Sequence, residues 1–387
     1  YPDAPTALFD RALVRLDAGD VSGGTSDLER ALALTPDYVS ALITLGRVHQ
    51  RQGRLEEARA IYSQVREIDD SELRATYGEV QALLGLGRWT DAAKLARLTI
   101  HRIPTSPDGY ILRSMVESAQ GSRDSALEDL GRALQADPEY WVARRERAWV
   151  RLKTGELRGA LEDLDRALAN PGADRADILG LRAETRLHLN DVPRAIDDLE
   201  GVLAASPGHA KAHWLRGRAR RLLGDLDGAL DDYDRAIEGS EDPASARVER
   251  GEIFEARGDL ARAAEDYDAA VRANPSAAPP HFRRGLLRSK NGDAGGAIED
   301  LREAVRAAPT SARYRVALAH LLLESGRPAE ALQEIEAGLR AGSNDPPLYL
   351  ARGQARLLLL DPSGALEDID RAVAGGERTA ETHRVRG

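Results

Sequence analysis

Several residue types are absent or scarce in this chain of 387 residues. It has no cysteine, one methionine and three phenylalanines, and aromatic residues make up only 4% of it. The lack of cysteine excludes disulfides, thiolate metal sites and cysteine nucleophiles. No apolar run approaches the length of a membrane-spanning helix, since the longest leucine run is Leu357–Leu360. Any core must therefore consist mainly of alanine, leucine, valine and isoleucine.

An excess of positive charge is also lacking. The net charge is −10, and charged residues of both signs make up 30% of the chain. Nucleic acids and anionic membranes are bound by basic surfaces, so this balance argues against either as a partner. Only four of the 54 basic residues are lysine, a bias that is typical of high-GC bacteria. The absence of cysteine favours an extracytoplasmic compartment over the cytoplasm.

What the chain does contain is an internal repeat. Prolines recur 34 residues apart, or at about twice that spacing, with one residue inserted near 170–172, and they are Pro36, Pro104, Pro138, Pro207, Pro275 and Pro309. With this proline as position 32, the chain divides into eleven full repeats and a stub. The repeats are 5–38, 39–72, 73–106, 107–140, 141–175, 176–209, 210–243, 244–277, 278–311, 312–345 and 346–379, and the stub is 380–387.

Each repeat has the pattern of two helices joined by a tight turn. Position 15 is glycine in nine repeats, Asn190 in the sixth and Leu360 in the last, so a helix is predicted to end there in every repeat but the last. Positions 8 and 20, on either side of the turn, are almost always alanine, glycine or serine. Small residues there allow two antiparallel helices to pack closely. Apolar residues such as Ala229, Tyr233 and Ala236 follow helical spacing.

These positions resemble the tetratricopeptide repeat. The resemblance rests on the period together with Pro36, Leu42, the pair Leu45 and Gly46, Ala58 and Tyr62, and it covers residues 5–387. It implies an all-α fold, a single right-handed superhelical α-solenoid over 5–379 in which the first helix of each repeat lines the concave side. Two departures are expected to disturb the packing. The third repeat has Thr76, Glu79 and Val80 at core positions, and Leu360 and Pro362 distort the last turn.

Two charged positions vary together. Arginine at position 7 and aspartate at position 23 occur in the same eight repeats, and the three repeats without the arginine also lack the aspartate. We therefore predict a half-buried ion pair between the two helices of a repeat, because a guanidinium can meet a carboxylate with two parallel hydrogen bonds. The alternative is a ladder of arginines for an anionic ligand. The pairs are Arg11 with Asp27, Arg113 with Asp129, Arg147 with Asp163, Arg182 with Asp198, Arg216 with Asp232, Arg250 with Asp266, Arg284 with Asp300 and Arg352 with Asp368.

The sequence offers no convincing catalytic or metal site. His209 and His213 are four residues apart, but no third ligand is evident, and His213 occupies a packing position. The run Asp225–Gly228 lacks the further acids of a calcium loop and is typical of a helix start. No nucleotide-binding or hydrolase motif occurs, and the acidic clusters recur from repeat to repeat. We expect no enzymatic activity, no cofactor and no metal.

The binding surface that the sequence favours is the concave groove over repeats five to seven. At the positions that line the groove in this family, it contains aromatic and basic residues, with Asp177 and Glu184 as the opposing acids. Such a surface suits a peptide with aromatic or apolar anchors and some acidic residues. For Trp214 the alternative is packing between repeats. The expected groove residues are Arg145, Trp149, Lys153, His188, Lys211, Trp214, Arg218 and Arg221.

Three functional hypotheses follow. The first is a non-catalytic scaffold or adaptor that binds a partner protein or peptide in its groove. The second is a regulatory or substrate-recruiting arm of a larger enzyme, since the chain begins at Tyr1 rather than methionine and stops within a twelfth repeat, as expected for part of a longer protein. The third is self-assembly by end-to-end stacking of uncapped repeats.

Overall fold

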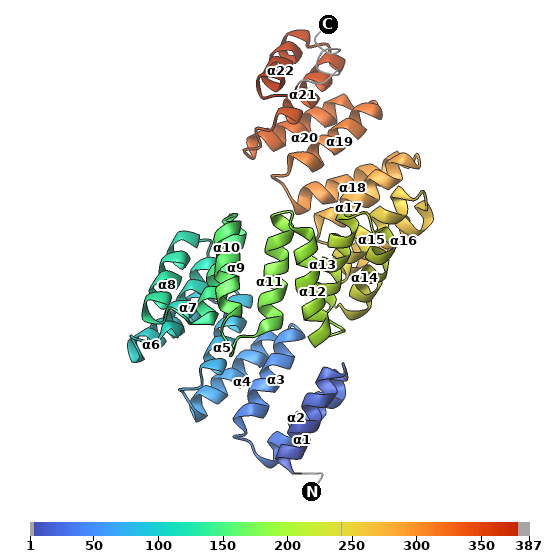
Figure 1. The fold of residues 1–387 in the computed structure, drawn as a ribbon. Helices are drawn as coiled ribbons and strands as arrows, with labels where there is room; N and C mark the ends of the chain where they lie inside the picture. The colour runs from blue at the N-terminus through green and yellow to red at the C-terminus, as the bar shows by residue number, and fades with distance from the viewer. Residues whose placement is uncertain (1–3, 241, 378–387) are drawn as a thin grey trace. The chain divides into compact units, whose positions relative to one another are not determined.

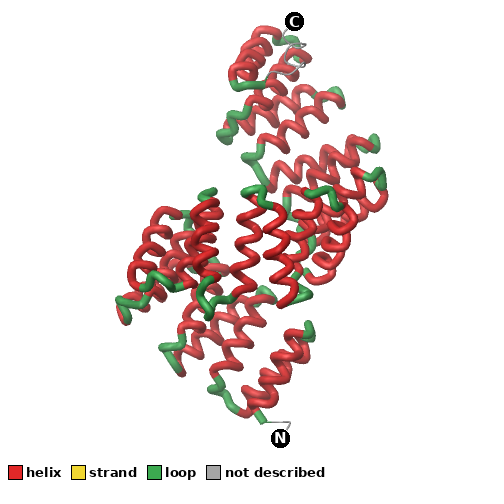
Figure 2. Tube along the Cα trace, viewed as in Figure 1, coloured by secondary structure: helices red, strands yellow, loops and turns green. Residues whose placement is uncertain are grey.

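The computed structural model describes residues 4–240 and 242–377, and every regular element in those ranges is an α-helix (Figures 1 and 2). The helices are 12 to 14 residues long, as in α10 (Leu157–Leu168) and α9 (Trp141–Thr154). Helices of this length are marginal on their own in water, so they depend on packing against their neighbours. The fold is the all-α solenoid of helix pairs that the sequence predicts.

The chain divides into two compact units, Tyr1–Asp191 and Val192–Gly387, which we call unit 1 and unit 2. The helices of unit 1 are α1 (Pro5–Asp17), α2 (Val21–Leu34), α3 (Val39–Arg51), α4 (Leu55–Ile68), α5 (Leu73–Gly85), α6 (Trp89–Arg102), α7 (Pro107–Ala119), α8 (Arg123–Ala136), α9 (Trp141–Thr154), α10 (Leu157–Leu168) and α11 (Arg175–His188).

Unit 2 has the same construction. Its helices are α12 (Val192–Ala205), α13 (Ala210–Leu222), α14 (Leu226–Gly239), α15 (Ala244–Ala256), α16 (Leu260–Ala273), α17 (Ala278–Lys290), α18 (Ala294–Ala307), α19 (Ala312–Glu324), α20 (Pro328–Arg340), α21 (Pro346–Leu358) and α22 (Pro362–Ala374). The odd-numbered helices begin at the starts expected for the repeats, except that α11 begins at Arg175 instead of residue 176. We propose the division into eleven repeats on this basis; the stub 380–387 lies outside the described residues.

The turn between the two helices of a pair is set by one residue with positive φ. Gly155 has φ of 83°, and the other glycines at this position have similar values. Leu360 adopts the same region with φ of 63°, so the expectation that the last repeat would not turn here is wrong. Packing of α21 against α22 overrides the local preference of leucine, whose Cβ makes this conformation unfavourable by about 1–2 kcal/mol.

The two helices of a pair approach closely because residue sizes are matched across them. Gly217 lies against the ring of Tyr233, and a Cβ on Gly217 would come within 2.7 Å of that ring. The third repeat reverses the sizes, with Val80 on its first helix and the small Ala96 on its second, both fully buried in one cluster. The departures that we expected to disturb this repeat are thus accommodated. Glu79, buried as well, accepts a hydrogen bond from Arg66 at 2.8 Å.

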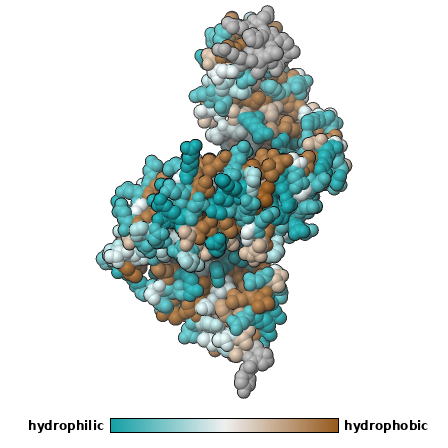
Figure 3. All heavy atoms as spheres, viewed as in Figure 1, coloured by the Kyte–Doolittle hydropathy of each residue, from teal (hydrophilic) through white to brown (hydrophobic). Residues whose placement is uncertain are grey.

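The first helices of successive pairs also contact each other. In unit 1, α3 contacts α5, α5 contacts α7, and α7 contacts α9. These helices form one continuous layer, and their side chains can therefore combine into a common surface. Figure 3 shows that hydrophilic side chains cover much of the visible surface around smaller hydrophobic areas, as expected for amphipathic helices. Every helix described between residues 4 and 377 is too short or too polar to cross a bilayer.

Candidate binding cavity and the buried ion pairs

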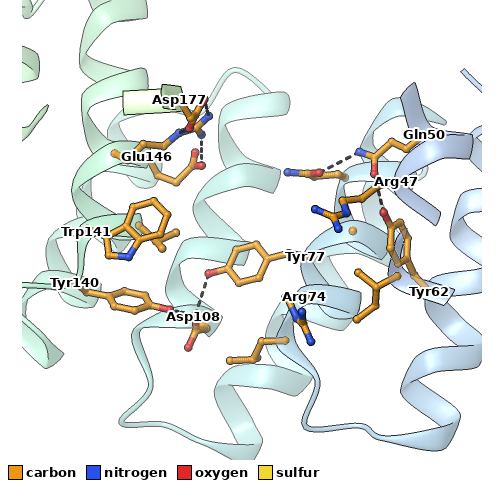
Figure 4. A pocket seen from close by; sticks show the side chains of 16 residues that line it. Arg47, Gln50, Tyr62, Arg74, Tyr77, Asp108, Tyr140, Trp141, Glu146 and Asp177 are labelled. Atoms are coloured by element: carbon orange, nitrogen blue, oxygen red, sulfur yellow. Dashed lines mark hydrogen bonds and ion pairs between the residues drawn. The ribbon is translucent and has the colours of Figure 1, made fainter. Parts of the chain in front are cut away.

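A cavity in unit 1 opens on the layer of first helices, with side chains from α3, α5, α7, α9 and α11, from Tyr62 on α4 and from Tyr140 just before α9 (Figure 4). Its volume is about 570 Å³. Four aromatic rings line it, from Tyr62, Tyr77, Tyr140 and Trp141, together with carboxylates, guanidinium groups and two glutamines. An apolar cavity with a few convergent polar groups is the usual form of a binding site.

Asp108, on α7, lies at one end of this cavity and is only 5% exposed. Its Oδ1 accepts hydrogen bonds from the hydroxyls of Tyr77 at 3.1 Å and Tyr140 at 2.6 Å, and its Oδ2 accepts one from Ser106 at 2.6 Å. Burial and the charge of Asp108 raise the pKa of both tyrosines, so the hydroxyls stay protonated and act as donors. Three neutral donors thus surround one buried carboxylate.

Arg145 belongs to the same end of the cavity and is held by two acids. Its Nε and Nη2 donate to Asp177 on α11 at 2.7 and 3.2 Å, and its Nη1 contacts Glu146. Burial raises the pKa of Glu146, although the neighbouring Arg145 opposes this effect. The positive charge of Arg145 is therefore balanced by its neighbours.

The opposite end of the cavity, at the right of Figure 4, is polar and basic. Gln50 on α3 donates to Gln81 on α5 at 3.0 Å and accepts from the hydroxyl of Tyr62 at 3.2 Å. Arg47 lines this end and forms no ion pair with any residue of the described ranges. Arg74 is held by both oxygens of Glu72. The acids Asp108, Glu146 and Asp177 thus lie at one end of the cavity together with Arg145, and Arg47 lies at the other.

The eight groove residues expected from the sequence divide between the two units. In unit 1, Arg145 lines the cavity described above. Trp149 is 37% exposed, His188 is exposed, and Lys153 lies 3.4 Å from Glu184. Sequence reasoning therefore selected one residue of the cavity and missed its aromatic wall.

In unit 2, Trp214 is half-buried and packs against the cluster of α14 and α15, with its Nε1 buried and without a partner in the described residues. The guanidinium carbon of Arg218 lies over the Trp214 ring, 5.0 Å from the ring centroid. Arg218 and Arg221 face acids of α15, Arg218 at 3.5 Å from Glu249 and Arg221 at 3.0 Å from Glu252.

Lys211, the fourth expected groove residue of unit 2, is exposed. Of these four residues, Arg218 and Arg221 thus have their charges balanced by acids of α15.

The covarying arginines and aspartates lie together within their repeats. In seven of the eight pairs, Nε and Nη2 of the arginine reach the two oxygens of an aspartate that is buried on the second helix. Arg182 donates to Asp165 at 2.7 Å, and its predicted pairing with Asp198, which belongs to unit 2, stays a prediction. The observed pairs are Arg11–Asp27, Arg113–Asp129, Arg147–Asp163, Arg216–Asp232, Arg250–Asp266, Arg284–Asp300 and Arg352–Asp368.

Sequence reasoning missed a second arginine on most of these carboxylates. One helical turn after Arg216, Arg220 donates to Asp232 at 2.8 Å and to the carbonyl of Gly228 at 3.1 Å. The signal was present, because arginine at position 11 is accompanied by glycine at position 19 in five of six repeats. The arginines at position 11 that bind in this way are Arg15, Arg151, Arg220, Arg288 and Arg356.

His213 is a structural residue of the same network. It is buried, with Nδ1 at 3.0 Å from Asp232 and Nε2 at 2.8 Å from the carbonyl of Pro207 in the preceding repeat. His281 repeats this arrangement with Asp300 and Pro275. The buried aspartates are thus the points where helices of one repeat, and neighbouring repeats, are joined.

Comparison with known proteins agrees with this architecture. Profiles of the tetratricopeptide repeat match residues 15–76, 112–178, 181–246, 232–278 and 289–356. The chain belongs to the tetratricopeptide repeat family, whose arrays bind other proteins.

Among curated relatives, protein FlbA of Caulobacter vibrioides is 25% identical over 162 residues, covering 42% of this chain and 27% of the relative. The tetratricopeptide repeat and J domain-containing co-chaperone DNJ1 of Fusarium oxysporum is 24% identical over 208 residues, covering 51% of this chain and 40% of the relative. The matched region thus spans less than half the length of either relative.

Solved structures show the same fold at low sequence identity. Yeast Tom70 has a TM-score of 0.54 at 14% identity, covering 98% of this chain and 94% of that one. Human IFIT1 has a TM-score of 0.56 at 16% identity, covering 97% and 90%.

Proposed function

We propose that this chain is a non-catalytic scaffold that binds a segment of a partner protein in the cavity of unit 1. The cavity supports this proposal because five successive first helices contribute to its lining, so an extended segment lying across them would contact several repeats at once. Its aromatic side chains provide large rigid contact areas, which commonly dominate binding energy at protein interfaces.

We place the partner in this cavity instead of over Lys211, Trp214, Arg218 and Arg221. Arg218 and Arg221 already face Glu249 and Glu252, so an acidic partner would have to displace existing ion pairs. The cavity of unit 1 requires no such exchange, since Arg47 has no acidic partner within the described ranges and a carboxylate of the ligand can approach it.

A second candidate function is that of a recruiting arm in a larger protein. The matched region covers 27% and 40% of two curated relatives, and the name of one of them joins tetratricopeptide repeats to a J domain. In that case the cavity would still bind a protein segment, and another part of the protein would act on what is bound.

Peptide selection tests the cavity directly. Peptides would be selected from a random display library on the wild-type chain, and their dissociation constants measured by fluorescence anisotropy. We expect Trp141→Ala to weaken the selected peptides at least about tenfold, as removal of a central aromatic residue does. The matched control Trp214→Ala, in unit 2, should leave them unchanged.

Hydrogen exchange would locate the bound peptide. Protection of α5, α7 and α9 on binding supports the proposal. Equal affinity for the Trp141→Ala variant, together with protection confined to other helices, would rule it out. Thermal melting of both variants checks that loss of binding does not reflect unfolding.

A further inference from the structure

We propose that the Asp108 end of the cavity takes a cationic side chain, a lysine or arginine, of the bound segment. This inference rests on the proposed function and specifies the chemistry of its ligand. It reverses the charge expected from the sequence, which favoured an acidic partner, because the cavity combines a buried carboxylate with aromatic rings.

Asp108 differs from the other buried aspartates of the chain. Two or more hydrogen bonds from an arginine reach each of Asp27, Asp129, Asp163, Asp232, Asp266, Asp300 and Asp368. Within residues 4–240 and 242–377, no arginine, lysine or histidine forms an ion pair with Asp108. Its charge is compensated only by three neutral hydroxyl donors and by the N-terminal turn of α7, and the residue also lines the open volume of the cavity. A cationic ligand would supply the missing charge.

The aromatic residues around Asp108 suit such a ligand. In Figure 4, Trp141 and Tyr140 form one wall, and Tyr77 extends from the other side with its hydroxyl toward Asp108. The faces of tryptophan and tyrosine rings attract ammonium and guanidinium groups, and more strongly where water is excluded. A long basic side chain could pack its methylene groups on the rings and direct its charge to the carboxylate.

The other charged groups at this end do not cancel the attraction. Among the described residues, Arg145 is the only cation that lines it, and two acids, Asp177 and Glu146, already hold that guanidinium. Arg47 lies at the far end of the cavity, where it suits a carboxylate of the same segment. The expected ligand is therefore a segment with a basic residue at one end and an acidic residue at the other.

The test uses Trp141 as its reporter. Replacing Trp89, Trp149 and Trp214 by phenylalanine leaves one tryptophan, in the cavity wall. The probes are acetyl-Gly-Gly-Arg-Gly-Gly-amide and the same peptide with citrulline, which has nearly the shape of arginine but no charge. We expect the arginine peptide to bind about tenfold more tightly than the citrulline peptide, in the range of a desolvated cation on aromatic rings and a carboxylate.

Two variants separate a binding role for Asp108 from a structural one. Asp108→Asn should reduce the preference for arginine to less than about twofold, since the charge that discriminates the two probes is gone. Asp124→Asn, the same change of net charge at an exposed position of α8, should keep the preference.

Equal binding of the arginine and citrulline peptides to the wild-type chain would overturn the inference, as would an unchanged preference in Asp108→Asn. Either result leaves the proposed function standing if display-selected peptides still bind the cavity and lose affinity in Trp141→Ala. If the selected peptides do not depend on Trp141, the proposed function itself fails.

Discussion

The buried ion pairs make a graded prediction, because they differ in how many donors each aspartate has. Asp266, with a side chain 4% exposed, receives 2.9 and 2.6 Å hydrogen bonds from Arg250, and its next cation, Arg247, is 3.7 Å away. Asp232, with a side chain 1% exposed, has Arg216 and, in addition, Arg220 at 2.8 Å and His213 at 3.0 Å.

Replacing each position-7 arginine by alanine should therefore have unequal effects. Arg250→Ala leaves a buried carboxylate with no close donor, and we expect the free energy of unfolding to fall by ~3–5 kcal/mol. Arg216→Ala leaves Asp232 with Arg220 and His213, and the expected loss is ~1–3 kcal/mol, that of a charged hydrogen bond. The exposed contact of Arg250 with Asp234 adds little to the difference.

Hydrogen exchange at pH 7 is the appropriate assay, because it reports the opening of each helix pair separately. Amides of α15 and α16 should lose more protection in Arg250→Ala than amides of α13 and α14 lose in Arg216→Ala. In the double variant Arg216→Ala with Arg220→Ala, amides of α13 and α14 should lose as much protection as amides of α15 and α16 lose in Arg250→Ala. Arg216→Ala with wild-type protection, or with a larger loss than Arg250→Ala, would refute the reasoning.

Three further predictions concern the turns, the packing and one half-buried acid. Leu360→Gly should stabilise the last pair by ~1 kcal/mol in urea denaturation, because it relieves a positive φ at a side chain that is 88% exposed, whereas Leu358→Gly, within α21, should destabilise it. Gly217→Ala should lower stability by ~1–3 kcal/mol, since its Cβ would come within 2.7 Å of the Tyr233 ring; an unchanged melting temperature would contradict the packing argument. Burial raises the pKa of Glu249 above its usual value of 4.5. The stability that protonated Glu249 contributes is therefore fully present below pH 4.5 and is lost as the pH rises through the folded-state pKa. Glu249→Gln should therefore gain stability relative to the wild type between pH 4.5 and pH 7, and a constant difference across that range would argue against a raised pKa.

The repeat made much of the architecture predictable. Eleven internal copies show which positions must be small, which must turn and which vary together, so the helix pairs could be predicted from glycine, alanine and proline spacing. The same comparison could have found the second arginine of the network through its link to glycine at position 19. The reversal of residue sizes between Val80 and Ala96 was harder to predict, since it occurs in one repeat only.

The cavity escaped prediction for the opposite reason. Its main residues, Tyr77, Asp108, Tyr140 and Trp141, occupy positions whose residue type varies from repeat to repeat, so averaging over copies hides them. They also come from three repeats, and no spacing along the chain indicates that two tyrosine hydroxyls meet one carboxylate.

The sequence by itself determined the helix pairs, their turns and the ion pairs within a repeat, because these depend on contacts between residues fewer than 20 positions apart, repeated many times. Only the tertiary structure decided where an uncompensated charge faces a cavity and which arginines are already neutralised. Those properties depend on side chains that stacking brings together from separate repeats, and on the exclusion of water between them.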